Sequence, residues 1–354
     1  MQHRGLRPLW VTTLAGVVRV YRHYYWCKAD GAGCAPFDEA LGLYRGYTRA
    51  VQRVVAFLAA ITSFGEAARM LRRMLGITLD KNTVRDIARY LAAAYEERQQ
   101  RACRTIKAIM GAAPFVERLY IEIDAAKFHA VDDWRDTKVG VVFDVRQVNG
   151  VQHVNDKTYV AGNEHIDAFG ARFFAHAARR GVCNAREVIA LADGAPYNWA
   201  MVDLHFPHAV QILDIYHAYE HLATLRHCAW REDDPVGTAW YRAQKRRLKA
   251  GYRDAFFSHF DNVPCATDEQ RTCRRTTIGY FQDNRLRIRY GEFRRKGYFI
   301  GSGVVESGCK RIVTQRLKLP GARWLRNNAH LMAQLRAAYL NDYLDDIGKF
   351  MLAA

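Results

Sequence analysis

The order of hydrophobic and polar positions divides the chain into segments of different kinds. Residues 10–26 alternate between apolar and polar positions on both sides of Ala15-Gly16, which predicts a β-hairpin. Residues 46–102 repeat apolar positions at helical spacing. After about residue 116 short apolar runs follow, which are typical of buried strands. We therefore expect a hairpin, then a helical region, then an α/β region.

The helical region contains the outline of a helix-turn-helix. Ser63 and Glu66 form a capping-box pattern at a helix start, and Gly76 predicts the end of that helix. A second helix follows after a short turn. In this interpretation, one side of the second helix would face DNA through Lys81, Asn82, Arg85 and Arg89. An ordinary helical pair with a solvated basic face explains the same residues.

The α/β region alternates strands with helices. The apolar runs at 119–124, 138–145, 187–193 and 209–214 predict four strands. Helical patterns lie between or after them, at 164–180, 195–204 and 215–229. Strands that come first in a meander and then alternate with helices indicate an α/β domain with a mixed sheet.

A basic stretch interrupts this region. Residues 232–297 lose the strand pattern, are helical and are rich in Arg and Lys, which predicts a helical insertion. Residues 304–317 and 328–345 predict closing helices. We therefore expect five segments: a β-hairpin with a cysteine loop (1–45), a helical, helix-turn-helix-like region that would bind DNA (46–115), the first part of an α/β core (116–231), the basic insertion (232–297) and the last part of the core (298–354).

Charge narrows the classes of partner. The 354 residues carry a formal net charge of +17, which favours a polyanion over a neutral metabolite. A membrane surface is the competing polyanion, but no segment reaches ~18 uncharged apolar residues, so we expect no membrane span. Eight cysteines scattered through a long chain favour reduced thiols in a cytosol. Cys27 and Cys34 resemble half of a zinc site, but without a second pair we expect free thiols and no zinc.

Three acidic residues stand at positions where chemistry is expected. Asp124 closes the apolar run 119–124, Asp193 closes 187–193, and Glu306 opens a basic segment. Carboxylates at one edge of a sheet suit hard divalent cations, and two such ions promote phosphodiester cleavage. Glu122 shares a strand face with Asp124 and is a possible accessory acid. The competing interpretation makes Asp124 and Asp193 turn or cap residues.

A second acid stands beside a histidine. Asp214 ends the fourth strand, and His217 lies one helical turn later. His217 and His221 share a helix face with Glu220, a pattern that also suggests zinc. The order His-Ala-Tyr-Glu-His differs from the His-Glu-x-x-His of metalloproteases, so we expect His217 to orient substrate or a carboxylate instead.

Basic residues follow Glu306 closely. An acid for metal beside bases for phosphate is what a nucleic-acid active site needs. A tryptophan among the bases would stack on an exposed base or else belong to the core. The expected DNA-contacting residues of this segment are Lys310, Arg311, Arg316, Lys318, Arg323 and Trp324.

Taken together, these motifs resemble the DDE transposases of bacterial insertion sequences, in the Kra and Lre groups allied to the Mutator-like elements. The resemblance covers nearly the whole chain. Its pieces are Ile-Glu-Ile-Asp at 121–124, Thr-Lys-Val-Gly-Val-Val-Phe at 137–143, Ala-Asp-Gly-Ala at 192–195, Ile-Leu-Asp-Ile-Tyr-His-Ala-Tyr-Glu-His-Leu at 212–222, Ile-Gly-Ser-Gly-Val-Val-Glu-Ser-Gly-Cys-Lys at 300–310 and the basic run at 316–324.

The resemblance implies an RNase H-like catalytic core with a helical insertion before the last acid. It places Asp124, Asp193 and Glu306 on the catalytic triad, which binds two Mg²⁺ ions with Mn²⁺ as a substitute. It also matches Asp214 and His217 to an acid-x-x-His motif. The expected partners are transposon terminal repeats and target DNA, bound by a homodimer or larger assembly in the bacterial cytoplasm, at the nucleoid. The alternatives are a repurposed DNA-binding protein and an RNase H-like nuclease or resolvase without strand transfer.

Overall fold

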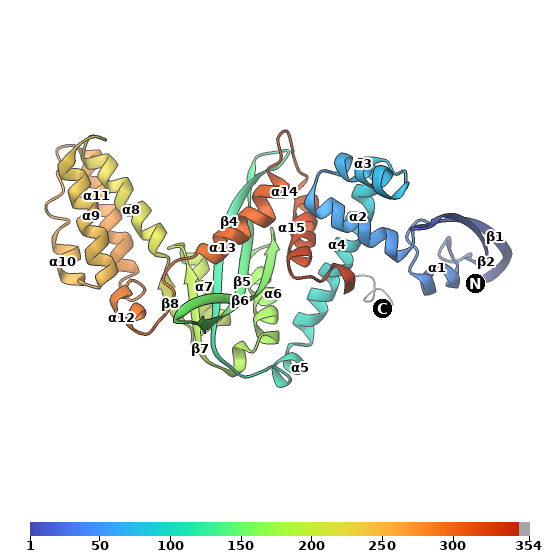
Figure 1. Ribbon diagram of the computed structural model, residues 1–354, viewed down its shortest axis with the longest axis horizontal. Coiled ribbons are helices and arrows are strands. Elements are labelled where there is room, and N and C mark those ends of the chain that lie inside the picture. The colour runs from blue at the N-terminus through green and yellow to red at the C-terminus, as the bar shows by residue number, and fades with distance from the viewer. Residues whose placement is uncertain (347–354) are drawn as a thin grey trace.

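The computed structural model describes residues 1–346 and has three parts along its longest axis. Figure 1 shows a bundle of helices at one end, a sheet with its covering helices in the middle, and further helices with a hairpin at the other end. Residues 347–354, which belong to the predicted last part of the core, lie outside the described residues. Among residues 1–346, no helix is both long enough and apolar enough to cross a membrane.

The predicted N-terminal hairpin is present and is longer than expected. β1 (Gln2–Thr13) pairs antiparallel with β2 (Gly16–Cys27), and β3 (Ala32–Cys34) adds a short third strand. Cys27 ends β2 and Cys34 ends β3, and both are free thiols. The short helix α1 (Pro36–Leu41) follows.

The helical region has the caps that the sequence predicts. α2 (Arg49–Ile61) precedes α3 (Phe64–Leu75), where the Ser63 side chain accepts a hydrogen bond from the Glu66 amide. α3 ends at Gly76, which has the left-handed φ of 66° that favours glycine. Asp80 then caps α4 (Lys81–Arg104), and the short α5 (Ile106–Gly111) follows. The two helices and the turn between them are therefore confirmed as elements.

A five-stranded mixed sheet forms the middle of the molecule. Its order is β6-β5-β4-β7-β8, in which β4, β5 and β6 are antiparallel and β4, β7 and β8 are parallel. The strands are β4 (Val116–His129), β5 (Trp134–Val148), β6 (Val151–Gly162), β7 (Ala185–Ala192) and β8 (Val210–Leu213). The sequence predicts only four of them. The sequence does not predict β6 because its first half is exposed or half-buried and mostly polar, and only its end is buried.

The strand that carries Asp124 is longer than predicted, so Asp124 lies inside β4 and does not close it. β5 continues to pair with β4 as far as His129, which opposes Trp134. The parallel partner β7 stops earlier, because its last residue, Ala192, pairs with Ile123. Asp124 is thus the first residue of β4 beyond its parallel neighbour.

The two faces of the sheet are covered by different helices (Figure 1). On one face lies α6 (Ile166–Arg179), whose Phe173 ring fills the space over Gly140 of β5. On the other face lies α13 (Gly303–Cys309), whose Gly308 packs against Val139 and Tyr159. Because Val139 opposes Asp124 directly in the register, Asp124 and Glu122 share the face that α13 covers.

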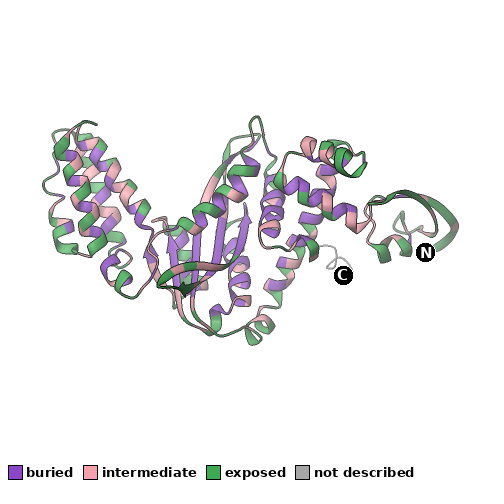
Figure 2. Cartoon of the chain, in the orientation of Figure 1, coloured by how far each residue is buried: buried purple, intermediate pink, exposed green. Residues whose placement is uncertain are grey.

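The predicted insertion consists of helices joined by turns and loops, and it has apolar packing of its own. Its helices are α9 (Pro235–Ala250), α10 (Arg253–Ser258), α11 (Asp268–Asp283) and α12 (Tyr290–Arg295). Phe256, Phe260 and Phe281 are fully buried among them, and the rings of Phe256 and Phe281 meet edge to face at 4.9 Å. Figure 2 shows that the buried residues of these helices face the inside of the bundle. The chain enters the bundle through α8 (Ile215–Ala229), which follows α7 (Pro196–His205) and β8.

The chain returns to the sheet and closes with further helices, as predicted. α13 continues as a π-helical turn (Lys310–Thr314) and the short α14 (Gln315–Leu317). α15 (Arg326–Leu340) then packs against α4, α2 and β6.

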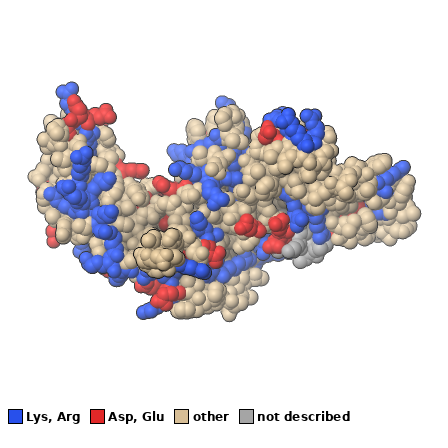
Figure 3. Space-filling model, viewed as in Figure 1, with Lys and Arg blue, Asp and Glu red and all other residues tan. Residues whose placement is uncertain are grey.

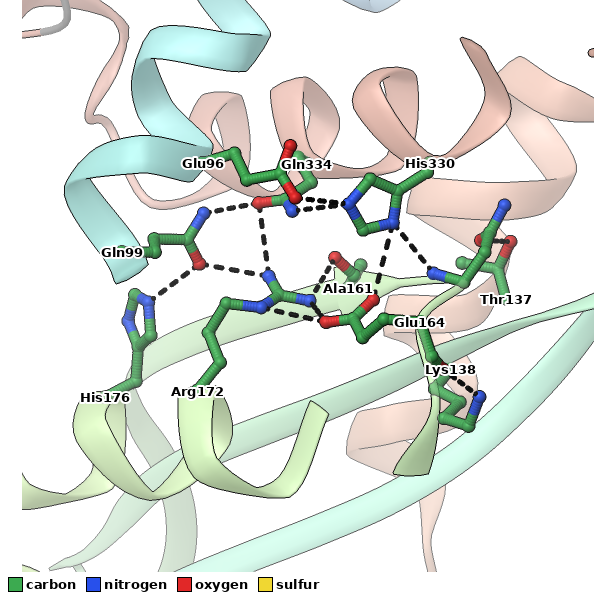
Figure 4. A network of polar contacts seen from close by, with 11 residues as sticks. Glu96, Gln99, Thr137, Lys138, Ala161, Glu164, Arg172, His176, His330 and Gln334 are labelled. Atoms are coloured by element: carbon green, nitrogen blue, oxygen red, sulfur yellow. Dashed lines mark hydrogen bonds and ion pairs between the residues drawn. The ribbon is translucent and has the colours of Figure 1, made fainter. Parts of the chain in front are cut away.

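A buried polar network joins the N-terminal helices to the sheet region (Figure 4). Arg172 of α6 is 5% exposed and donates to Gln99 of α4, Gln334 of α15 and the carbonyl of Ala161. Glu164 forms an ion pair with the same guanidinium. A buried Arg is tolerated only when its donors are paired, so this network fixes α4, α6 and α15 in one arrangement.

Candidate active site

Asp124 and Asp193 meet at one edge of the sheet. Ile123 pairs with Ala192 in the parallel register, so the residues that follow, Asp124 and Asp193, emerge side by side. Both are half-buried, and one ligand atom from each lies within 4.8 Å of a ring nitrogen of His217. The sequence prediction that these two acids come together is therefore in agreement with the structure, and His217 joins them.

Asp193 is held by the turn that it begins. Its Oδ1 accepts hydrogen bonds from the amide of Ala195, at 3.0 Å, and from the side chain of Asn198, at 2.7 Å. Both bonds fall on the same oxygen, so Oδ2 can serve a ligand. The turn interpretation and the ligand interpretation of Asp193 are thus compatible, because the turn orients the carboxylate.

The insertion touches this turn directly. The ring of Tyr280 from α11 lies over Gly194, where a Cβ would come within 2.2 Å of the ring. The same ring stacks on His221 of α8, with centroids 3.6 Å apart. His221 therefore faces the insertion, whereas His217 faces the acids, and the two histidines do not act as a pair.

A backbone amide and a thiol contact the carboxylate of Asp124 and offset part of the cost of burying its charge. Its Oδ1 accepts from the amide of Ala125 at 2.7 Å, and the Sγ of Cys309 lies 3.6 Å from its Oδ2. Burial raises the pKa of Asp124 above its ordinary value. A cation at this position would offset the cost of keeping the carboxylate charged.

Glu122 lies on the same face, two residues earlier, and is 1% exposed. Its Oε2 accepts a hydrogen bond from the amide of Val305 in the first turn of α13, at 2.8 Å. Burial raises the pKa of Glu122 to about 8. Glu122 therefore anchors α13 over the sheet, beneath the candidate site.

Asp214 and His217 form a tight pair at the start of α8. Asp214 caps the helix through the amides of Tyr216 and His217, and its Oδ2 lies 2.9 Å from Nδ1 of His217. Its other oxygen accepts from the amide of Ser302 at 2.9 Å. Burial opposes the charge of Asp214, but the bonds from His217 and Ser302 outweigh it and hold its pKa below the ordinary value. The hydrogen bond to Asp214 raises the pKa of His217 to about 9.

Glu306, the third acid of the expected triad, lies on α13 and is exposed. It precedes Cys309 by three residues, so the two share a face of the helix. The group of metal-binding atoms found among residues 1–346 contains Asp124, Asp193 and His217 without Glu306. The structure thus places Glu306 on the helix that covers the site, one turn from the thiol that touches Asp124.

The bases that follow Glu306 separate into two sets. Lys310, Lys318 and Arg323 are exposed, and Arg311 is half-buried. Arg316 and Trp324 are buried, at 2% and 7% exposure, which corrects the expectation that they contact DNA.

Packing explains the burial of these two residues. The Nε of Arg316 donates to the carbonyl of Ala59 in α2 at 2.7 Å, and its guanidinium lies 5.1 Å from the centre of the Trp324 ring. Trp324 donates to the carbonyl of Leu317. Both side chains join the closing segment to the N-terminal helices.

The helix-turn-helix residues lie at the start of α4. Lys81, Asn82 and Arg89 are exposed, as a DNA-facing surface requires. Arg85 is half-buried and donates to Asp86 at 3.0 Å.

Sequence reasoning missed three groups that shape the site. Cys309, Asn198 and the amide of Ser302 hold Asp124, Asp193 and Asp214, respectively. The signal for Cys309 was its position three residues after Glu306 in the same helical segment. Asn198 and Ser302 carry no pattern of their own, because each acts across a turn or from a distant segment.

The chemistry of the donors fits a hard divalent cation. Two carboxylates that share an edge are the ligands that Mg²⁺ prefers, and Mn²⁺ also accepts imidazole. Nδ1 of His217 is bonded to Asp214, and the raised pKa of about 9 keeps the ring protonated at neutral pH, so its Nε2 is a donor rather than a metal ligand. Asp124 and Asp193 would hold such an ion, and His217 would border it.

Comparison with known proteins gives one assignment. A search of curated proteins finds no significant match. The sequence model of an uncharacterised protein family, UPF0236, matches residues 2–350. This match spans nearly all of the 354 residues, so the chain belongs to the uncharacterised protein family UPF0236.

Proposed function

We propose that this protein is a DDE-type transposase that cuts and joins DNA with divalent metal ions. The observation that carries the proposal is the meeting of Asp124 and Asp193 at the end of their parallel pairing, beside His217. The mixed sheet and the helical insertion agree with the RNase H-like core that the resemblance implies. The net charge of +17 supports a polyanionic substrate.

In this proposal the acids and bases divide the work. Asp124 and Asp193 would hold Mg²⁺ or Mn²⁺, and Glu306, which lies outside their cluster in this structure, would supply the third carboxylate by turning toward them from α13. The metal ions, when bound, activate the attacking oxygen and stabilise the leaving oxygen of a phosphodiester. His217, held by Asp214, offers a positive charge toward the scissile phosphate. Water attacks a phosphodiester at the end of the element and breaks its P–O3′ bond, which leaves a 3′-hydroxyl and a 5′-phosphate. The 3′-hydroxyl then attacks a phosphodiester of target DNA, and the 3′-oxygen of the target strand leaves.

The N-terminal helices have a separate role. Lys81, Asn82 and Arg89 present one surface for the terminal repeats of the element. Two ends must be processed together, so we propose that two or more copies assemble on DNA.

The test is a cleavage assay with DNA that contains the flanks of the gene. The wild type should nick the ends in Mg²⁺ and should join pre-cleaved ends to a target plasmid. Asp193→Asn should lose both reactions at least ~100-fold, because metal-assisted cleavage depends on the carboxylate. Asp233→Asn, an exposed acid outside the site, is the matched control and should act as wild type.

Two outcomes would contradict the proposal. Undiminished cleavage by Asp193→Asn would remove Asp193 from the site. Cleavage by the wild type without any joining of pre-cleaved ends would indicate a nuclease rather than a transposase.

A further inference from the structure

The insertion carries a row of cations on one helix face. Arg242, Lys245, Arg246 and Lys249 of α9 follow one another at spacings of three, one and three residues. These spacings place all four on one side of a helix, over ~10 Å of its length. Figure 3 shows Lys and Arg side chains gathered in a column on the insertion, at the left of the view.

This row lines a groove between α9 and α8. The groove has a volume of about 820 Å³, and α8 contributes Tyr219 and Arg226 to its wall. Among the described residues, no carboxylate lines it. Like charges kept together without a compensating acid indicate an anionic ligand, since mutual repulsion opposes the arrangement.

Aromatic rings stand among the cations. The Nζ of Lys245 lies 4.2 Å from the centre of the Tyr219 ring and 5.1 Å from that of Tyr241. Tyr216, one turn before Tyr219, is 55% exposed and packs against Gly301. A basic groove with an exposed ring such as that of Tyr216 suits single-stranded nucleic acid, because a base stacks on the ring while the cations bind the phosphates.

The groove leads toward the acidic residues. A second hollow, of about 510 Å³, shares Tyr219 and Lys249 with the first and extends past Tyr216 to Gly301 and Val304. It ends at the start of α13, where the amide of Ser302 binds Asp214. Tyr216 is the immediate neighbour of His217 in α8. The two hollows therefore form one path from the insertion to Gly301, which lies beside the Asp214 carboxylate that binds His217.

We propose that this path, here called the α8–α9 groove, binds an unpaired DNA strand that leaves the catalytic site. The proposal deepens the proposed function and rests on it for the choice of DNA. The cations of α9 bind successive phosphates, and Tyr216 stacks on a base that is no longer paired.

The first experiment measures binding without cleavage. Anisotropy of a labelled single strand of about 15 nucleotides is compared with that of its duplex, in EDTA. The single strand should bind more tightly to the full-length wild type. The double variant Arg242→Gln, Arg246→Gln should bind it at least ~10-fold more weakly, and its salt slope should fall by ~0.7 for each lost phosphate contact. The matched control is Arg274→Gln, Arg275→Gln on α11, which should bind as wild type.

The second experiment tests stacking. Tyr216→Leu should weaken single-strand binding by ~5- to 100-fold, the range of one lost base–ring contact. Tyr216→Phe keeps the ring and should bind the single strand as the wild type does. Neither variant should change the affinity for the duplex. Thermal melting of each variant establishes that it is folded.

The outcomes separate this proposal from the proposed function. Unchanged single-strand binding in the Arg242/Arg246 variant, or tighter binding of duplex by the same row, would overturn the groove assignment. If that variant no longer self-associates but still binds the strand, the groove is a contact surface between two copies of the chain, and this result would also overturn the groove assignment. A wild type that binds the strand through this groove but never cuts DNA would refute the nuclease activity alone.

Discussion

The thiol of Cys309 lies 3.6 Å from a carboxylate oxygen of Asp124, although the two residues are 185 positions apart in the chain. The contact joins α13 to the middle of β4. It also shows how the third segment of the site is fixed: α13 is held over the sheet by this thiol and by the amide that binds Glu122.

We predict that Cys309 is the slowest of the eight thiols to react with an alkylating reagent. It is 7% exposed, and burial together with the charge of Asp124 raises its pKa above the ordinary thiol value. Timed labelling followed by mass spectrometry gives the rate at each cysteine. Cys183, which is exposed, is the internal reference. Equal rates at Cys183 and Cys309 in the native protein would show that α13 does not cover Asp124.

Replacing Gly194 with alanine should disturb both stability and cleavage. A Cβ would lie 2.2 Å from the ring of Tyr280, which stacking on His221 holds in place. We expect a loss of about 1–3 kcal/mol in the free energy of unfolding, from overpacking. Urea denaturation measures the loss, and the cleavage rate should fall with it because Asp193 precedes the glycine.

Gly279→Ala provides the matched control for this change. Gly279 neighbours Tyr280 in α11, and a Cβ there meets nothing within 4 Å. The substitution should be neutral or stabilise by up to ~1 kcal/mol through helix propensity. If both alanine substitutions change the free energy of unfolding equally, the contact between Tyr280 and the Asp193 turn does not contribute to stability.

Stability should decrease as the solution becomes acidic, in part through His176. Burial lowers the pKa of His176 to about 3, with the charges of Arg179 and Arg172 in the same direction. The folded state therefore keeps this ring neutral, while the unfolded chain binds a proton near pH 6.5. The unfolded state holds more protons between pH 6.5 and 3, so this stabilising contribution is complete above pH 6.5 and declines below it.

The size of the effect follows from linkage. One proton of difference gives a slope of up to ~1.4 kcal/mol per pH unit in the free energy of unfolding. Urea denaturation of the wild type and of His176→Gln at several pH values isolates the contribution of this ring. Parallel curves for the two proteins would mean that His176 does not titrate on unfolding.

Arg316→Leu should destabilise the fold, and under the proposed function it should leave the affinity for DNA unchanged. The change leaves the carbonyl of Ala59 without its donor and removes the cation that lies between Phe64 and Trp324. We expect a loss of about 1–3 kcal/mol. Arg323→Gln, an exposed neighbour, should give the opposite result, with unchanged melting and weaker DNA binding. If the Arg316→Leu variant is folded and loses DNA affinity, while Arg323→Gln does not, Arg316 contacts DNA after all.

The parts of the site that lie on strands were accessible from the sequence. The apolar runs before Asp124 and Asp193 predict two buried strands, and parallel strands bring their ends to one edge. The position of Asp124 within β4 was not accessible, because it depends on how far β5 continues to pair. β6 was missed because strand pairing, rather than burial, holds its polar half in the sheet.

The pattern of charges does not predict which basic side chains are exposed, because tertiary packing determines their burial. Arg316 has the same sequence context as Lys310 and Lys318, but α2 and Trp324 enclose it. No local pattern indicates that a carbonyl 257 residues away will accept its hydrogen bond. Asp214 is a similar case, because its second oxygen accepts a hydrogen bond from the amide of Ser302, which follows the insertion in the chain.

The order of these segments along the chain has a consequence for synthesis. Asp124, Asp193 and Asp214 leave the ribosome well before Ser302, Val305 and Cys309, which satisfy Asp214, Glu122 and Asp124. A growing chain that stops before residue 302 carries the acids but lacks the helix that seats them. The candidate site is therefore completed late in synthesis, because the groups that bind Asp214, Glu122 and Asp124 emerge only after the whole insertion has been made.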